Sequence, residues 1–305
     1  MKKMKTDIII TTGDPNGIGP EVTLKALNSN KFDLNRIILI SNKEVLNYYG
    51  SIPDVRLINI DFDPKNIQPS KITKEAGDFS FKCLEHACNL LKSGNYSALV
   101  TAPVAKEAMH MAGHNFSGQT EILQHFLARE NQKAEMLFVA KNFRVLLLTR
   151  HIALKQINLS KDEVVNKILN LVKYLKTKIK EPKIALCSLN PHAGEHGMFG
   201  DEEEKVLIPA VKILRNLGLD ITMPLPSDTL FVGVNYPNPP YDCYVACYHD
   251  QGLIPIKLIA QKETVNTTIG LDVIRTSPAH GTAFDIAGKG IASADSMIAA
   301  IEQVI

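Results

Sequence analysis

Short runs of β-branched and other apolar residues alternate along this chain with longer segments in which apolar residues recur at helical spacing. This alternation is typical of a mainly parallel sheet covered by helices. The apolar runs predict strands over 6–11, 36–41, 55–60, 96–101, 135–140, 143–149, 183–189, 242–248 and 264–269. The helical spacing predicts helices over 20–29, 75–92, 119–130, 160–179, 200–217 and 292–304. The pattern therefore predicts an α/β fold.

The length of the chain favours two lobes. With 305 residues it is long enough for two hydrophobic cores, because single cores stop growing at about 250–300 residues. No Ser/Gly-rich linker separates two halves, so we expect the chain to cross between the lobes more than once. We predict a first α/β lobe from residues 1–130 plus 270–305 and a second from residues 131–269, with a cleft between them.

Composition and charge limit the classes of partner. Hydrophobic residues make up 45% and charged residues 22% of the chain, which excludes a disordered protein. The formal charge of +2 is spread over 34 basic and 32 acidic side chains, so no basic field suggests nucleic acid or a membrane surface. The five cysteines form no C-x-x-C pair and are expected to be buried thiols. Without a signal-peptide core or an apolar run of membrane-spanning length, we expect a cytoplasmic protein with a small-molecule partner.

Three histidines each follow an apolar run within a few residues. His151 follows FRVLLLT, His192 follows KIALCSL, and His249 directly follows CYVACY. Because ligand and catalytic groups in open α/β sheets lie outside the carboxyl ends of the strands, the three imidazoles are expected to converge there. A lone histidine is more often a surface or core residue. For three histidines at equivalent strand ends, a divalent-metal site and this ordinary interpretation are about equally favoured.

Two polar segments leave alternatives open. The first strand runs into TGDPNGIGPE (12–21), whose glycine spacing matches neither the Walker A loop nor the dinucleotide fingerprint. It suits a helix N-terminus facing an anion and a tight turn with positive φ equally well. Thr120 begins the helix predicted over 119–130 and offers its hydroxyl either to a phosphate or to the helix as a cap. VTAPVAKE (100–107) is interpreted mainly as scaffold.

Carboxylates and cations accompany the histidines. Asp250 directly follows His249, which fits a metal ligand beside a carboxylate that orients it or accepts a proton. Asp228, in PSDTLF, is a second candidate base. Lys257 and Arg275 supply the positive charge that a phosphorylated substrate needs, although surface solvation is the alternative for each basic residue alone.

Taken in order, seven segments resemble the 4-hydroxythreonine-4-phosphate dehydrogenase family of vitamin B6 biosynthesis. They are GDPNGIGPE, VTAPVAKE, the G-x-T-E tetrad, LNPHAGE, PSDTLF, YHDQGLIPIK and VNTTIGLDVIRTSPAHGTAFDIAGKG. The resemblance spans residues 11–290, and YHDQG followed by R-T-S-x-x-H-G-T is highly specific. It implies a homodimer of two-lobed α/β/α subunits, related to the isocitrate and isopropylmalate dehydrogenases, with the active site in the interlobe cleft near the subunit interface.

The resemblance also implies the roles of individual residues. The divalent metal of the family, which is zinc, magnesium or cobalt, is held by histidines that match His151, His192 and His249, while His196 lies where the family does not require histidine. The substrate contacts of the family match Thr120, Lys257, Asn266 and Arg275. The tetrad departs from the usual G-H-T-E at Gln119, whose amide can bind a phosphate oxygen but cannot move a proton.

The implied activity is the NAD- and metal-dependent oxidation of 4-phosphooxy-L-threonine at C3, followed by decarboxylation to 3-amino-2-oxopropyl phosphate. Asp250, Asp228 and Lys257 are the expected catalytic residues, and NAD or NADP is the expected cofactor, with no residues assigned to it. Relatives that oxidise 4-phospho-D-threonate or 4-phospho-D-erythronate share most of these motifs and are the alternative. A phosphate acyltransferase of the same broad fold is a rival that needs no metal, and a solute-binding protein is a third reading that the missing export signal disfavours.

Overall fold

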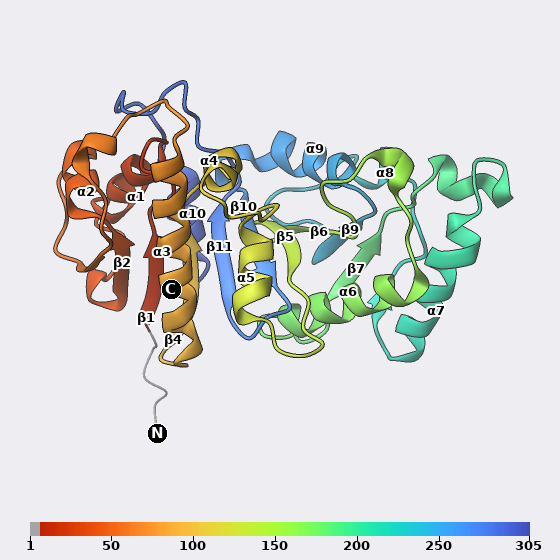
Figure 1. Ribbon diagram of the computed structural model, residues 1–305. Coiled ribbons are helices and arrows are strands. Elements are labelled where there is room, and N and C mark those ends of the chain that lie inside the picture. The colour runs from red at the N-terminus through yellow and green to blue at the C-terminus, as the bar shows by residue number, and fades with distance from the viewer. Residues whose placement is uncertain (1–6) are drawn as a thin grey trace. The chain divides into compact units, whose positions relative to one another are not determined.

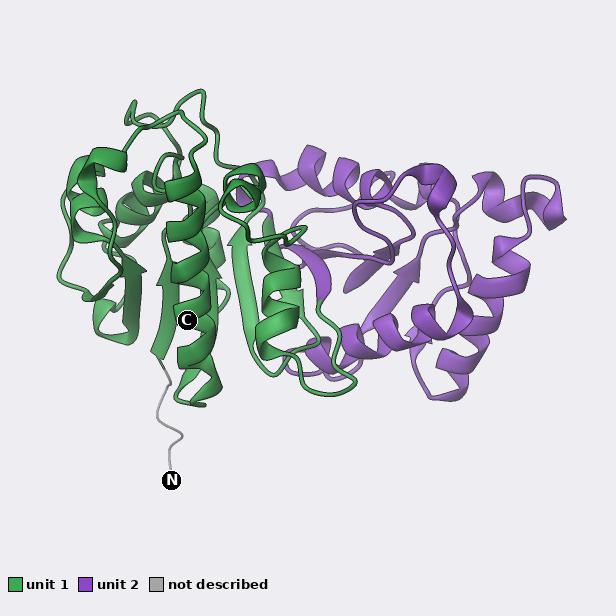
Figure 2. Ribbon diagram, viewed as in Figure 1, with its two compact units in different colours: residues 1–134, 265–305 green, residues 135–264 purple. Residues whose placement is uncertain are grey.

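The computed structural model describes residues 7–305. The chain divides into two compact units (Figure 1). Unit 1 comprises residues 1–134 and 265–305, and unit 2 comprises residues 135–264 (Figure 2). The basic N-terminal residues and the first residue of the strand predicted over 6–11 lie outside the described residues. Among residues 7–305, no helix is both long and apolar enough to cross a membrane.

Unit 1 is built on a sheet with the strand order β3-β2-β1-β4-β11-β10. Its strands are β1 (Asp7–Thr11), β2 (Ile37–Ser41), β3 (Arg56–Asn59), β4 (Tyr96–Thr101), β10 (Val265–Ile269) and β11 (Ile274–Pro278). Its α-helices are α1 (Gly19–Leu27), α2 (Lys43–Tyr49), α3 (Lys74–Lys92), α4 (Lys106–Met111), α5 (Gln119–Leu127) and α10 (Asp295–Glu302). All neighbouring strands are parallel except β10 and β11, so the carboxyl ends of β1, β4 and β11 share one edge.

Alternate side chains of β1 are buried on opposite faces of this sheet. Ile8 and Ile10 belong to one core, with side chains of α1 and α10. Ile9 belongs to the other, with Phe79 of α3 and Leu123 of α5. Successive strand residues point to opposite faces, so a strand of consecutive isoleucines is expected only where helices cover both sides.

Unit 2 has the strand order β5-β6-β9-β7-β8. Its strands are β5 (Glu135–Ala140), β6 (Phe143–Leu147), β7 (Lys183–Leu186), β8 (Asp220–Ile221) and β9 (Cys243–Ala246). Its α-helices are α6 (Lys161–Leu175), α7 (Ile208–Asn216), α8 (Ser227–Leu230) and α9 (His249–Ala260). Only β5 and β6 are antiparallel, so β6, β9 and β7 end at the same edge.

Short turns of helix complete the two units. The 3₁₀ segments are Leu34–Arg36, Pro64–Asn66, Leu154–Gln156, Pro191–Gly197 and Gln261–Glu263, and a π segment covers Glu203–Leu207. The helix predicted over 200–217 runs without a break from 202 to 216, and its first part is the π segment. The 189–200 segment is not a regular right-handed helix, because the residues from His192 to His196 all have positive φ.

The mainly parallel α/β pattern is confirmed, but two strands and one long helix escaped prediction. β8 has only two residues, and β11 carries Arg275, Thr276 and Ser277. Helix α9 contains Gly252 and Pro255, which are rare inside helices, so its sequence did not predict a helix. The glycine is needed for packing, since a Cβ atom there would lie 2.7 Å from Cγ1 of Val145 on β6.

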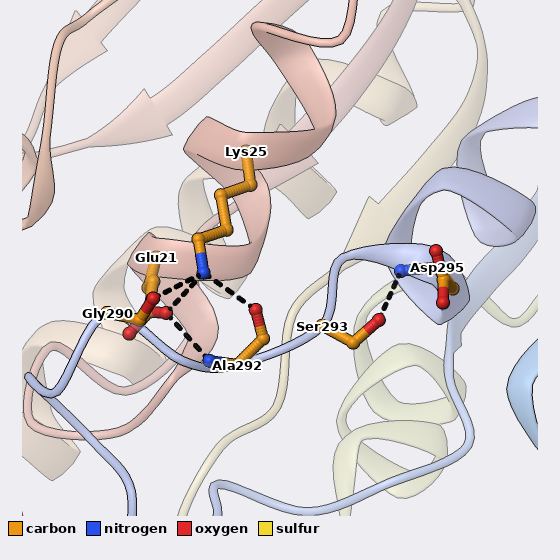
Figure 3. Close-up of polar contacts among 6 residues, drawn as sticks. All are labelled: Glu21, Lys25, Gly290, Ala292, Ser293 and Asp295. Atoms are coloured by element: carbon orange, nitrogen blue, oxygen red, sulfur yellow. Dashed lines mark hydrogen bonds and ion pairs between the residues drawn. The ribbon is translucent and has the colours of Figure 1, made fainter.

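Glu21 of the glycine-rich segment ties α1 to the C-terminal part of unit 1 (Figure 3). Its buried carboxylate accepts hydrogen bonds from the backbone N–H of Ala292 at 2.9 Å and from Nζ of Lys25 at 2.8 Å. The same ammonium donates to the carbonyl oxygens of Gly290 at 2.9 Å and Ala292 at 2.8 Å. One carboxylate therefore fixes residues about 270 positions apart in the chain, which is a structural role for the end of this motif.

We expect Glu21→Ala to lower the free energy of unfolding by about 2–3 kcal/mol, because it leaves a buried N–H and an ammonium without their acceptor. Urea unfolding followed by circular dichroism measures this loss. Glu302→Ala, which removes an exposed carboxylate from α10, is the control and should change stability by less than about 0.5 kcal/mol. Equal stability of the two variants would contradict the structural role of Glu21.

Candidate functional site

The three histidines follow neighbouring parallel strands of unit 2. His151 follows β6, His249 follows β9, and His192 follows β7. Since β9 pairs with both β6 and β7 in parallel, the three chain segments leave the sheet at one edge. This is the placement on which the prediction of a convergent site depends.

His151 and His249 lie together at this edge. Their ring centroids are 5.4 Å apart, with 47° between the ring planes. His249 is the first residue of α9, and its Nδ1 lies 2.6 Å from Oδ1 of Asp250. An ionised carboxylate only accepts hydrogen bonds, so Nδ1 donates and Nε2 is left for a ligand. Such a carboxylate–imidazole pair is typical of metal-binding histidines.

His192 lies apart from this pair. It opens a left-handed stretch, with φ of 51° at His192, 54° at Ala193 and 55° at His196. Its ring centroid is 6.2 Å from that of Phe199. In the part of the chain that the structure describes, no three His, Cys, Asp or Glu side chains are grouped closely enough to hold a metal ion. Two of the three predicted ligands are therefore adjacent, and the third belongs to a strained segment.

Gln251 connects the three segments that carry His249, His192 and Asp228. Its Oε1 accepts a hydrogen bond from the N–H of Cys247 at 2.6 Å. Its Nε2 donates to the carbonyl oxygen of Ser188 at 2.6 Å and to Oγ of Ser227 at 2.7 Å. These residues precede His249, His192 and Asp228, respectively. No role was predicted for Gln251, because its partners come from segments far apart in the sequence.

A buried carboxylate supports the His192 loop from the other side. Glu203 is 1% exposed and accepts hydrogen bonds from the N–H groups of Leu189 at 2.7 Å and Asn190 at 2.8 Å. Glu203 is therefore structural, because it satisfies backbone donors beyond the end of β7.

The other predicted residues of unit 2 are exposed. Asp228 lies on α8 and Lys257 on α9, and the side chain of Asp250 is 72% exposed. Within residues 7–305, Asp228 and Lys257 make no side-chain hydrogen bond or ion pair. Both side chains are therefore available to a ligand.

In unit 1, Arg275 is a buried cation at the centre of the sheet. It is 3% exposed on β11, and its Nε donates to Oγ1 of Thr101, at the end of β4, at 2.7 Å. Burial lowers the pKa of the guanidinium to about 9, and the charge of Glu121 opposes this shift. The two Nη groups make no hydrogen bond within the described residues. Thr101 belongs to the segment that was interpreted mainly as scaffold. Its hydroxyl holds Arg275 by Nε, which leaves the Nη donors of Arg275 to a ligand.

The predicted substrate-binding residues of α5 and β10 are also partly buried. Nε2 of Gln119 donates to the carbonyl oxygen of Ala102 at 3.1 Å, while its Oε1 is buried without a partner. Oδ1 of Asn266 is likewise buried and unpaired. Thr120 is 3% exposed, and the capping alternative is wrong, because Gly118 caps α5 without a side-chain bond.

Asp14 is the buried acid of the glycine-rich segment. It is fully buried: Oδ1 accepts from the N–H of Asn16 at 2.8 Å, and Oδ2 has no partner in the described residues. Burial raises its pKa to about 6, against smaller opposite effects of the N–H groups of Asn16 and Ala105. Gly13 before it has φ of +71°, and a Cβ atom there would lie 2.1 Å from the carbonyl oxygen of Pro103. The tight-turn interpretation is therefore correct for this glycine.

Comparison with known proteins gives consistent similarity over the whole chain. Residues 5–304 match the family model described as pyridoxal phosphate biosynthetic protein PdxA. A 4-hydroxythreonine-4-phosphate dehydrogenase from Synechocystis sp. is 40% identical, over 97% of this chain and 93% of that protein. A D-threonate 4-phosphate dehydrogenase from Salmonella typhimurium is 37% identical, over 97% of both chains. The crystal structure of a 4-hydroxythreonine-4-phosphate dehydrogenase from Klebsiella pneumoniae superposes with a TM-score of 0.85 at 36% identity, covering 98% of both chains.

More distant structures show the fold alone. A β-decarboxylating dehydrogenase from Thermococcus kodakarensis has a TM-score of 0.54 at 13% identity, covering 96% of this chain and 80% of that chain. A branched-chain phosphotransacylase from Enterococcus faecalis has a TM-score of 0.56 at 13% identity, covering 98% of both. The predicted fold class is confirmed, and because both enzyme classes share it, the fold does not by itself choose between them.

We expect Gln251→Met to lower the free energy of unfolding by about 2–4 kcal/mol, because it removes the partners of a buried N–H and a buried carbonyl group. Chemical denaturation of the metal-free protein measures this loss. Gln261→Met, which changes an exposed amide just after α9, is the matched control and should leave stability nearly unchanged. A Gln251 variant as stable as this control would show that the amide does not hold the three loops.

The raised pKa of Asp14 predicts a pH-dependent stability. A carboxyl whose folded pKa exceeds its unfolded pKa stabilises the fold only while protonated, so this contribution is lost as the pH rises from about 4 to 6. Asp14→Asn does not titrate. Relative to wild type, it should therefore gain about 2–3 kcal/mol of unfolding free energy between pH 4 and pH 7.5. Urea titrations at both pH values test this, with the exposed Asp54→Asn as control, and the same pH profile in wild type and Asp14→Asn would refute the assignment.

Proposed function

The chain belongs to the family of pyridoxal phosphate biosynthetic proteins PdxA, and we propose that it oxidises 4-phosphooxy-L-threonine at C3 with NAD. Decarboxylation of the product then gives 3-amino-2-oxopropyl phosphate. Relatives named as dehydrogenases of phosphorylated four-carbon acids support this activity. The observation that carries the proposal is the His151–His249 pair with Asp250 at the carboxyl edge of unit 2. A phosphate acyltransferase has no use for such a pair.

The donor set of this pair fits a divalent ion. Two imidazoles lie together, and one is oriented by a carboxylate, which suits zinc or cobalt and is compatible with magnesium. We propose that His151, His192 and His249 hold the ion, with His192 joining from its left-handed segment. When bound, a divalent ion supplies Lewis acidity that favours loss of the proton from the substrate hydroxyl.

Residues of the chain then accept the proton and bind the charged groups of the substrate. Asp250 or Asp228 takes the proton of the C3 hydroxyl, while hydride leaves C3 for the nicotinamide ring of NAD. The alcohol becomes a ketone, the resulting β-keto acid loses its carboxyl group as CO2, and the enolate that remains takes up a proton at C2 from the protonated aspartate or from water. Lys257 is proposed to stabilise charge during this step. The phosphate and carboxylate of the substrate are proposed to be held by Thr120, Lys257, Asn266 and Arg275.

A second candidate substrate is 4-phospho-D-threonate. The observation that favours it is the 37% identity to the Salmonella typhimurium D-threonate 4-phosphate dehydrogenase, close to the 40% of the Synechocystis relative. The two substrates differ at C2, where one carries an ammonium and the other a hydroxyl. We further propose NAD, with NADP as the alternative, a homodimer and a cytoplasmic location.

We expect His249→Ala to abolish metal-dependent NADH formation and to weaken zinc binding at least tenfold, because it removes the imidazole ligand that Asp250 orients. Initial rates and calorimetric zinc titration of the same preparation measure the two effects. His196→Ala is the matched control, since His196 lies outside the proposed ligand set, and it should keep both properties. Full activity of His249→Ala at ordinary metal concentration would sink the ligand assignment.

A further inference from the structure

Gln119 replaces the histidine of the family tetrad, and the structure determines which end of its amide is used. Nε2 lies 3.1 Å from the carbonyl oxygen of Ala102. A carbonyl oxygen only accepts hydrogen bonds, so the nitrogen must be the atom that faces it. One of the two N–H donors of the amide is therefore engaged by Ala102, and the other is left for a ligand.

The other end of the amide is an acceptor without a donor. Oε1 of Gln119 is buried and has no partner within residues 7–305. Leaving such an oxygen unpaired costs about 1–3 kcal/mol. Ionised phosphate and carboxylate oxygens are acceptors as well and cannot pair with it. A hydroxyl or an ammonium group can.

The neighbourhood of this oxygen is built for a phosphorylated ligand. Thr101 and Ala102 are consecutive residues at the end of β4: the first binds Nε of Arg275 and the second binds Gln119. The side chains of Arg275 and Gln119 are thus anchored on consecutive residues. Gln119 as a whole is partly exposed, so the side-chain movements common on ligand binding are enough to uncover its oxygen.

We propose that Gln119 accepts a hydrogen bond from a hydroxyl or ammonium group at C2 of the substrate and thereby selects for a donor at that carbon. The C3 hydroxyl is the reacting group, which leaves C2 as the donor position nearest to the phosphate-bearing end. This inference rests on the proposed function, since it takes Arg275 as the anchor of the phosphate. Both candidate substrates satisfy it, one through an ammonium and the other through a hydroxyl.

The test measures binding without NAD, so that no turnover occurs. Four probes are titrated by calorimetry: 4-phosphooxy-L-threonine, 4-phospho-D-threonate, 3-hydroxy-4-phosphooxybutanoate, which has no donor at C2, and inorganic phosphate. Wild type should bind the better donor-bearing probe about tenfold more tightly than the C2-deoxy probe. Gln119→Met should bring this ratio close to one and change the affinity for inorganic phosphate by less than about threefold. The probe whose advantage disappears identifies the donor as ammonium or hydroxyl.

A matched control separates this role from loosening of α5. Gln124 lies on the same helix, but its amide is fully paired, with Nε2 donating to the carbonyl oxygen of Gln132 at 2.9 Å and Oε1 accepting from the N–H of Ala134. Gln124→Met should lower stability and keep the binding ratio of wild type. Because each ratio is internal to one protein, partial destabilisation of either variant does not obscure it.

Gln119→His provides a second variant that keeps a donor for Ala102. At pH 8 its other ring nitrogen accepts a hydrogen bond, so the preference for a C2 donor should persist. At pH 5.5 that nitrogen carries a proton, so the preference should vanish and inorganic phosphate should bind more tightly than to wild type.

Three results would overturn the inference. The first is an unchanged ratio in Gln119→Met, which means that water or nothing pairs with the oxygen. The second is loss of inorganic phosphate binding in that variant with the ratio kept, which makes Gln119 a phosphate ligand. The third is absence of binding of all four probes to wild type. NADH formation by wild type is measured separately, so a protein that shows the C2 preference and yet never reduces NAD would refute the dehydrogenase and leave the role of Gln119 standing.

Discussion

Parallel pairing of β9 with both β6 and β7 is the constraint on which the candidate site depends. Parallel strands end at one edge, so the segments that follow them begin close together although they lie about 40 to 100 residues apart in the chain. His151 and His249 meet there because β6 and β9 are direct neighbours. The rest of the metal chemistry proposed for unit 2 presupposes this register.

The edge is then shaped by buried side chains that do not touch the reaction. Gln251 joins the ends of β7 and β9 to α8, and Glu203 satisfies the backbone beyond β7. Close packing of α9 on β6 at Gly252 places His249 and Asp250 at the first turn of that helix. The exposed residues are thus held in position by buried side chains whose hydrogen bonds are largely satisfied.

Unit 1 shows the opposite arrangement, in which buried polar atoms lack partners. Unpaired oxygens of Asp14, Gln119 and Asn266 and the free outer donors of Arg275 are each unfavourable in the ligand-free chain. Native structures keep few such groups, and a ligand or water that binds there is one explanation for them. The polar interior of this unit therefore agrees with a phosphorylated substrate that brings both acceptors and donors.

Much of this organisation was predictable from sequence. Apolar runs located every strand longer than two residues except β11, whose Arg275, Thr276 and Ser277 are buried by partners that only the fold supplies. Strand ends pointed to the three histidines, but not to the left-handed stretch that His192 opens, because residues other than glycine rarely adopt positive φ. Similarly, no pattern distinguishes Gln251, whose three partners come from separate loops, from an exposed glutamine.

The central claim is that this chain is a metal-dependent dehydrogenase of a phosphorylated four-carbon acid. The most direct test records NADH formation by the purified wild-type protein with 4-phosphooxy-L-threonine and 4-phospho-D-threonate, before chelation, after chelation and after zinc, cobalt or magnesium is restored. The account predicts NADH formation with at least one substrate, its loss on chelation and its return with metal. NADH formation that survives complete metal removal, or none with either substrate, would contradict it.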